Sequence, residues 1–143
     1  MGSGRGADHG EVRVGKATPV LYVEEVEPCL TFWVERLGFE VTGEVPHGDS
    51  VGFAMLERDG VEVMYQSRDS MEDDLPQAAD APSGAAFLFV EVEDLDRVEA
   101  ALEGIEPVVP RRQTFYGTDE LIVRDPAGNT ITFARFTEAR PGA

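Results

Sequence analysis

The chain has 143 residues, enough for one domain with a real core, and its hydrophobic fraction of 42% is that of an ordinary globular protein. Its formal net charge of −16 argues against nucleic acid and anionic membranes as partners, since both would be repelled, and it allows cationic partners. No apolar run approaches the ~20 residues of a membrane helix, and residues 1–13 hold no apolar leader sequence, so we expect a disordered tail and a cytoplasmic protein.

The first half of the chain predicts a strand and then a helix. Residues 12–23 have the character of a strand, and Pro19 indicates an edge position or an irregular start. Residues 26–38 predict a helix with one apolar face that ends at Gly38. Cys29 is the only cysteine and falls in this helix, so we expect no intrachain disulfide and a buried, unreactive thiol.

Three more strands follow, and two of them predict a hairpin. The three cover residues 39–45, 51–58 and 61–66. Asp59-Gly60 between two alternating runs is a strong signal for a two-residue turn. Such a turn sets a register that pairs three sets of side chains on one face: Glu57 with Glu62, Met55 with Met64 and Phe53 with Gln66.

The second half repeats this order after a polar stretch over residues 67–83, which we interpret as an acidic linker. Further strands are expected over residues 84–92, 105–109, 120–124 and 130–134, with a helix over 94–104 and a loop over 110–118. A tight turn separates the last two strands, because Pro126 fixes φ and Gly128 can take the positive φ that closes it.

The two halves align with each other. Val23 and Gly60 of the first half match Val92 and Gly128 of the second, 69 and 68 residues later. An internal duplication is the simplest explanation, and duplicated units must pair to bury their apolar faces. The sequence therefore predicts an α+β chain of two tandem βαβββ modules, with boundaries at 1–13 (tail), 14–66, 67–83 (linker), 84–136 and 137–143 (tail).

This pattern resembles the vicinal oxygen chelate superfamily, which includes glyoxalase I, extradiol dioxygenases, and fosfomycin- and bleomycin-resistance proteins. The resemblance covers about residues 17–136 and is carried by the repeat, by Leu37-Gly38-Phe39 and by the turn at residues 125–129. Within the superfamily, the chain looks most like the bleomycin-resistance branch. That likeness lies in Thr18-Pro-Val-Leu, in Phe32-Trp33 and in the residues around Leu37-Gly38-Phe39 and the turn at residues 125–129. The resemblance implies a curved sheet around a concave cup, helices on the outside and a metal-free homodimer.

Enzymes of that superfamily bind one metal in the cup through His or Glu at four equivalent strand positions. Carried onto this sequence, these positions are Thr18, Met64, Phe87 and Thr132. None suits a divalent cation, which prefers imidazole or carboxylate. His9 and His47 lie on no predicted cup strand; Glu62 and Glu91 could converge, but two carboxylates would hold Mg²⁺ or Ca²⁺ only weakly. We therefore predict no metal and no cofactor.

Side-chain alternation gives a candidate lining for the cup, made of aromatic and thioether groups with a few carboxylates and hydroxyls, as ligand pockets have. It comprises Thr18, Val20, Tyr22, Phe53, Met55, Glu62, Met64, Gln66, Phe87, Phe89, Glu91, Thr130 and Thr132. Tyr116 either closes the rim or is an ordinary loop aromatic. For any single aromatic, filling an interface between sheets or subunits explains its presence as well as ligand contact does.

The leading hypothesis is a metal-independent small-molecule binding protein that sequesters a hydrophobic or cationic aromatic compound such as an antibiotic. Glu62 and Glu91 would pair with the positive charge of a cationic ligand. The acidic run at residues 72–74 either raises the local concentration of that ligand or is a solvated part of the linker. The alternative is a lyase, isomerase or dioxygenase-like enzyme that uses an atypical metal or a carboxylate base, Glu62 with Tyr116 or Glu120. A ligand-responsive accessory protein is the third possibility.

Overall fold

The computed structural model describes residues 10–137, so the predictions for residues 1–9 and 138–143 of the tails lie outside it. The strands and helices are β1 (Val20–Val23), α1 (Glu27–Leu30), β2 (Glu40–His47), β3 (Ser50–Arg58), β4 (Val61–Ser67), α2 (Arg68–Asp74), β5 (Phe87–Glu91), α3 (Leu95–Ala101), β6 (Val109–Gln113), β7 (Thr118–Arg124) and β8 (Thr130–Phe136). They form two four-stranded sheets, β1-β4-β3-β2 and β5-β8-β7-β6. The predicted α+β fold of two βαβββ modules is confirmed.

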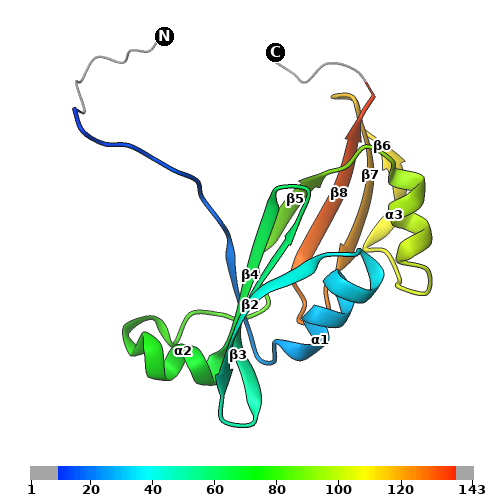
Figure 1. The fold of residues 1–143 in the computed structure, drawn as a ribbon. Helices are drawn as coiled ribbons and strands as arrows, with labels where there is room; N and C mark the ends of the chain where they lie inside the picture. The colour runs from blue at the N-terminus through cyan, green and yellow to red at the C-terminus, as the bar shows by residue number, and fades with distance from the viewer. Residues whose placement is uncertain (1–9, 138–143) are drawn as a thin grey trace.

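Helices α1 and α3 lie on one side of the sheets, and α2 projects on the other side near the lower end (Figure 1). Helix α1 continues as a π-helical segment over Thr31–Arg36. The predicted end at Gly38 is observed, with φ of 77° and a hydrogen bond from Phe39 N to Trp33 O that closes the helix. Over residues 10–137, no helix is long and apolar enough to cross a membrane.

The first hairpin has the predicted register. Asp59 and Gly60 take φ of 52° and 83°, as a two-residue turn requires. As a result Phe53 lies opposite Gln66, Met55 opposite Met64 and Glu57 opposite Glu62.

Three predicted segments differ from the structure. The first strand covers only Val20–Val23, the four residues that pair with Met64–Ser67 of β4. Residues 67–83 are more than a linker: Ser67 accepts a hydrogen bond from Ser70 N at 3.2 Å and starts α2. The strand predicted over residues 105–109 was placed too early. It occupies Val109–Gln113, where an edge position tolerates Pro110.

Both modules share one hydrophobic core on their helix-covered side. It contains Leu21, Val23, Val26, Cys29, Phe32, Trp33, Phe39, Ala54, Leu56, Val63, Tyr65, Leu95, Leu102, Leu121, Val123, Ile131 and Phe133. Cys29 is fully buried as predicted, and burial raises the pKa of its thiol to about 12. The predicted core position of Trp33 is also observed, with Phe32 and Phe39 packed edge-on against its ring.

A buried hydrogen-bond network joins the modules through the carboxylate of Asp125. Its Oδ2 accepts from Tyr65 Oη of the first module at 2.6 Å and from Asn129 Nδ2 at 2.9 Å. Its Oδ1 accepts from the backbone N of Asn129 and Ala127 at 2.8 and 3.0 Å. Trp33 Nε1 donates to Tyr65 Oη at 2.7 Å. The sequence identifies this turn, but not the buried network that its first residue organises.

We expect Tyr65→Phe to lower the free energy of unfolding by about 3 kcal/mol, because Asp125 loses a donor and Trp33 loses an acceptor in a buried place. Asp125→Asn should cost at least as much, since one amide N–H would face another donor. Tyr116→Phe is the matched control: its hydroxyl is part-exposed, so water can replace it and the loss should stay below about 1 kcal/mol. Denaturant unfolding measures all three, and equal losses for Tyr65→Phe and Tyr116→Phe would contradict the assigned role.

Candidate functional site

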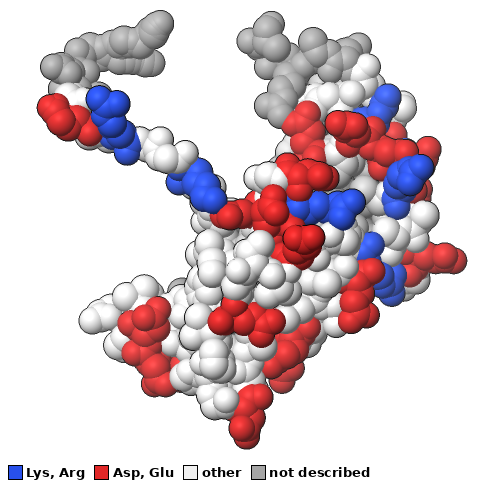
Figure 2. Space-filling view, viewed as in Figure 1, with Lys and Arg blue, Asp and Glu red and all other residues white. Residues whose placement is uncertain are grey.

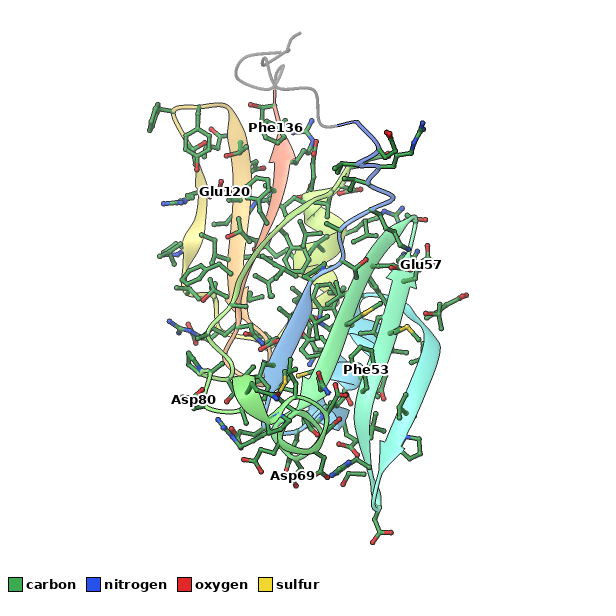
Figure 3. All side chains as sticks on the ribbon, turned by 90° about the vertical axis from the view of Figure 1, so that its left-hand side faces the viewer. Phe53, Glu57, Asp69, Asp80, Glu120 and Phe136 are labelled. Atoms are coloured by element: carbon green, nitrogen blue, oxygen red, sulfur yellow. The ribbon has the colours of Figure 1, made fainter. Side chains whose placement is uncertain are left out.

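The side of both sheets that faces away from α1 and α3 carries the predicted lining, and we call it the open face. On β4, Val63 and Tyr65 are buried in the core, so alternation turns Glu62 and Met64 to the open face. The same argument places Thr130 and Thr132 there, because Ile131 and Phe133 are buried. Figure 3 views this face, with Phe53 and Glu57 over the first sheet and Glu120 and Phe136 over the second.

The carboxylate of Glu62 is already paired on the open face of the first module. Lys16 Nζ lies 2.8 Å from Glu62 Oε1, and Thr18 Oγ1 donates to the same oxygen at 3.1 Å. Hydrogen bonds from Lys16 and then Thr18 hold the pKa of Glu62 below its usual value, so it is ionised at neutral pH. Lys16 is 67% exposed and Glu62 26% exposed. A ligand cation that binds Glu62 Oε1 would therefore have to take the place of Lys16.

The residues around Glu62 form the apolar part of the open face on the first module. Val20 lies opposite Met64 on the parallel partner strand, and Met55 lies opposite Met64 on the antiparallel one. Val20 is 46% exposed, and the two methionines are half-buried. Thioether side chains adapt to ligands of different shape.

Helix α2 covers the lower end of the open face. Gln66, a predicted lining residue, is only 6% exposed, because its Nε2 donates to Ser70 Oγ at 3.1 Å and to Asp74 Oδ2 at 3.3 Å. A cavity of about 370 Å³ lies there, lined by Phe53 and Gln66 and by Asp73 and Asp74 of α2. The acidic run at residues 72–74 thus belongs to a helix, and two of its members border the open face.

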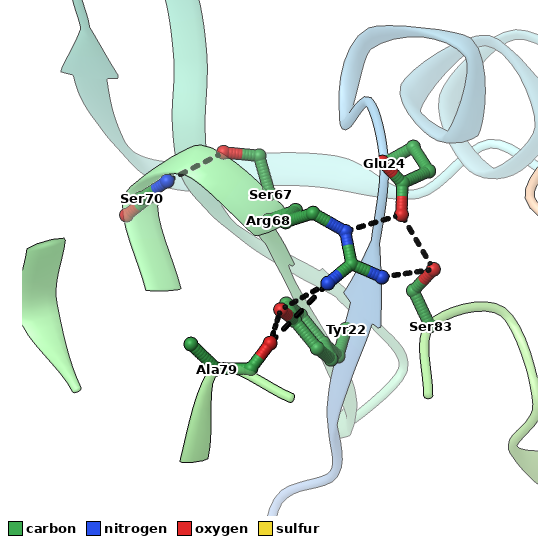
Figure 4. A network of polar contacts seen from close by, with 7 residues as sticks. All are labelled: Tyr22, Glu24, Ser67, Arg68, Ser70, Ala79 and Ser83. Atoms are coloured by element: carbon green, nitrogen blue, oxygen red, sulfur yellow. Dashed lines mark hydrogen bonds and ion pairs between the residues drawn. The ribbon is translucent and has the colours of Figure 1, made fainter. Parts of the chain in front are cut away.

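Arg68 fixes α2 in this position (Figure 4). Its Nε donates to Glu24 Oε2 at 2.7 Å, and its Nη1 donates to the hydroxyl of Tyr22 at 3.2 Å. The guanidinium also stacks over the Tyr22 ring at 5.2 Å, and the Tyr22 hydroxyl donates to the carbonyl of Ala79 at 2.8 Å. Tyr22 therefore helps to hold α2 in place and also lies on the open face.

The second module contributes the most exposed aromatic side chains of the predicted lining. Phe87 is 81% exposed and Phe89 54% exposed. They lie opposite Thr130 and Thr132 on β8, and the ring of Phe89 lies 6.2 Å from that of Phe136. Phe136 was missed, although alternation from Thr132 would have found it.

A polar cluster surrounds Glu120 on the same half. Glu120 is 2% exposed. Its Oε1 accepts from Arg112 Nε at 3.1 Å and lies 3.0 Å from Arg112 Nη2 as an ion pair. Its Oε2 accepts from Thr118 Oγ1 at 2.9 Å and from the hydroxyl of Tyr116 at 3.1 Å. Arg112 was not predicted as a site residue, because its segment was expected to form a loop.

Glu62 and Glu91, the two carboxylates that were expected to converge, do not belong to any metal-binding group of side chains among the described residues. Glu91 ends β5 opposite Ala134 and lines a groove of about 630 Å³ between the modules. Within residues 10–137, no three His, Cys, Asp or Glu side chains gather closely enough to hold a metal ion. The four positions at which the resemblance places the superfamily's ligands, Thr18, Met64, Phe87 and Thr132, carry hydroxyl, thioether and phenyl groups, which do not fit a divalent metal.

Acidic side chains spread over the surface seen in Figure 2, and basic ones occur mainly on the N-terminal arm and around α3. Near α3, Arg111 bridges Asp96, Glu99 and Asp119 at 2.7, 2.8 and 2.8 Å. The hydrogen bond from Arg111 lowers the pKa of Asp119. This network joins β6 to α3 on the helix-covered side. Arg111 therefore lies on that side, whereas its neighbour Arg112 lies on the open face.

Comparison with solved structures supports the fold. A glyoxalase/bleomycin resistance protein/dioxygenase from Nocardioides is 22% identical with a TM-score of 0.70, covering 92% of this chain and 91% of that one. Lactoylglutathione lyase from Agrobacterium tumefaciens is 15% identical with a TM-score of 0.68, covering 87% and 95%. TnmS3, an antibiotic binding protein from Streptomyces sp. CB03234, is 20% identical with a TM-score of 0.63, covering 87% and 99%. At these identities the likeness shows the fold alone.

Comparison with curated proteins gave no match. The family model of the Glyoxalase/Bleomycin resistance protein/Dioxygenase superfamily matches residues 14–133, which is most of the chain. The duplicated βαβββ topology and the helix-covered core agree with that match. The protein therefore belongs to the glyoxalase/bleomycin resistance protein/dioxygenase superfamily.

Proposed function

We propose that this protein binds a hydrophobic or cationic aromatic small molecule, such as an antibiotic, on its open face without the help of a metal. The observation that carries the proposal is the set of accessible apolar side chains there, above all Phe87 and Phe89, on the same face as the carboxylate of Glu62. A soluble protein that exposes large aromatic side chains on one face commonly uses them for binding. The antibiotic-binding protein TnmS3, with the same fold, supports this class of ligand.

Each part of the open face has a physical role in this proposal. Phenyl rings of the second module would stack on a ligand ring, which contributes about 0.5–1.5 kcal/mol per contact beyond area burial. Met55 and Met64 would adapt to the ligand's outline. The ligand's positive charge would replace Lys16 at Glu62, so the protein exchanges one ion pair for another and leaves no carboxylate unpaired.

We also propose that the binding unit is a homodimer in which a second copy covers part of the open face. Phe87, Phe89 and Val20 are all about half exposed or more. A flat sheet surface would bury less of a small ligand than the enclosed pockets in which ligands usually bind. A second copy that supplies the opposite wall would convert the open face into a cup.

The function is tested by a thermal-shift screen of cationic aromatic drugs and divalent metals, together with elemental analysis of the purified protein. We expect a drug to raise the melting temperature saturably, because a ligand that binds only the native state stabilises it. Chromatography should then recover the compound unchanged. Conversion of the bound compound, or a stoichiometric metal that is needed for binding, would favour the lyase or isomerase alternative.

Substitutions at the Glu62 ion pair should change the affinity for an aromatic monocation such as proflavine in opposite directions. Glu62→Gln should weaken binding about threefold and Lys16→Met should strengthen it by a similar factor, as expected for a partly exposed pair. Fluorescence titration measures both. Glu106→Gln, an exposed site in the connection between α3 and β6, is the matched control for the change in net charge. Equal effects of Glu62→Gln and Glu106→Gln would contradict a local role for Glu62.

The dimer is tested by placing a charge on the open face. Phe87→Glu should convert a dimer to a monomer in sedimentation equilibrium, because a carboxylate would be buried without a partner. Val61→Glu is the control, since Val61 is 40% exposed but shares the alternation of the buried Val63 and Tyr65 on the other face. A wild-type monomer at high micromolar concentration, or a dimer that survives Phe87→Glu, would contradict the proposed arrangement.

A further inference from the structure

The buried carboxylate of Glu120 is not explained by the fold, and the two modules provide the comparison. Gly60 and Gly128 bring β4 and β8 into correspondence, so Gln66 of the first module corresponds to Ala134 of the second. Phe53 lies opposite Gln66, and Glu120 lies opposite Ala134. A phenyl ring thus occupies in one module the place that a carboxylate occupies in the other. The βαβββ architecture accepts an apolar residue here.

Burying a carboxylate costs several kcal/mol unless it is paired and hydrogen-bonded. Glu120 meets that condition because Arg112 and Thr118 direct donors at it, and Tyr116 adds a third at the part-exposed side. Two of these partners remain accessible: Arg112 is 50% exposed and Tyr116 is 40% exposed. The carboxylate therefore holds two functional side chains in fixed positions at the edge of the open face.

The loop that carries Tyr116 is itself well defined. Thr114 N donates to Thr118 O at 2.8 Å, and the hydroxyls of Thr114 and Thr118 lie 2.6 Å apart. Gly117 closes the turn with φ of 93°, a value that other residues rarely adopt. Phe136 lies opposite Thr118 in the β7–β8 register, so the apolar wall of the second module adjoins the cluster. A ring stacked on that wall would hold a substituent beside Arg112 and Tyr116.

The chemistry of the two side chains indicates which substituent fits. Arg112 donates its Nε–H to Glu120 and holds Nη2 in ion-pair contact with it, which leaves at least three of its five N–H groups as donors. The Tyr116 hydroxyl donates to Glu120, so its oxygen can accept a hydrogen bond from a ligand N–H. The Arg112–Glu120 pair has no net charge, and the protein as a whole carries −16, which opposes a full anion. A neutral amide or other carbonyl matches the donors and the acceptor together.

We infer that Glu120 is a positioning residue that holds Arg112 and Tyr116 as a hydrogen-bonding subsite for a carbonyl or amide group of the ligand. The inference rests on the proposed function, since it specifies a substituent of the aromatic ligand bound on the open face. It divides the face into an ionic end at Glu62 and a neutral hydrogen-bonding end at Arg112.

The test uses the amide, carboxylate and methyl derivatives of naphthalene as probes, with the intact protein and fluorescence or ligand-observed NMR titration. The wild type should bind the amide about tenfold more tightly than the methyl compound, with the carboxylate weaker than the amide. Arg112→Gln should remove the preference for the amide and leave the affinity for the methyl compound unchanged. Glu120→Gln should do the same, a selective effect that a purely structural role would not produce.

Arg97→Gln provides the matched control, because Arg97 is 88% exposed on α3 and makes only a local ion pair with Asp94 within the part of the chain that the structure describes. It changes the net charge by the same amount and should keep the preference for the amide. Should Glu120→Gln fail to fold, Arg112→Gln decides alone. Equal binding of amide and methyl compound to the wild type, tighter binding of the carboxylate, or the same response in Arg112→Gln and Arg97→Gln would each overturn the subsite. Binding of none of the three probes would overturn both the subsite and the aromatic wall of the proposed function.

Discussion

The arrangement of the two modules depends on one buried carboxylate. Asp125 accepts four hydrogen bonds, from Tyr65 of the first module and from Asn129 and the backbone of its own turn. A carboxylate in such a place is tolerated only when donors surround it, and one of these donors, the Tyr65 hydroxyl, is supplied only when the modules are docked. The network therefore links the local shape of a turn to the relative position of the two sheets. Asn129 extends it further by accepting from Ala86 N at 2.9 Å, just before β5.

Because the docking uses the helix-covered faces, the other faces of both sheets are left for function. Tyr65 and Phe133 pack in the shared core, while their strand neighbours Met64 and Thr132 face the other way. Helix α2 then shapes one end of that surface, held by Arg68 against Tyr22 and Glu24. A segment whose composition resembles a solvated linker thus becomes part of the wall of the candidate site.

Duplication gives the two halves the same backbone but different chemistry. The first half has thioethers and an ion pair, Lys16 with Glu62, whereas the second has exposed phenyl rings and the neutral Arg112–Glu120 pair. None of these groups provides the imidazole or carboxylate set that the superfamily's enzymes use for a metal. The same fold in a lactoylglutathione lyase and in an antibiotic binding protein shows that the scaffold alone decides neither function. The side chains of the open face favour the binding role.

From the sequence alone one could predict most of the strands, the register of the first hairpin and the side of the sheet that a strand residue occupies, but not the extent of β1 or the position of β6. These are local properties: a period of two separates the faces, and Asp59-Gly60 fixes the pairing of Met55 with Met64. The pairing of Lys16 with Glu62, the link that Asp125 makes between the modules and the convergence of Arg112 and Tyr116 on Glu120 became visible in the folded structure. The reason is physical. An ion pair or a buried hydrogen bond depends on how segments distant in sequence are brought together. Neither periodicity nor turn chemistry tells which of these segments will lie next to each other.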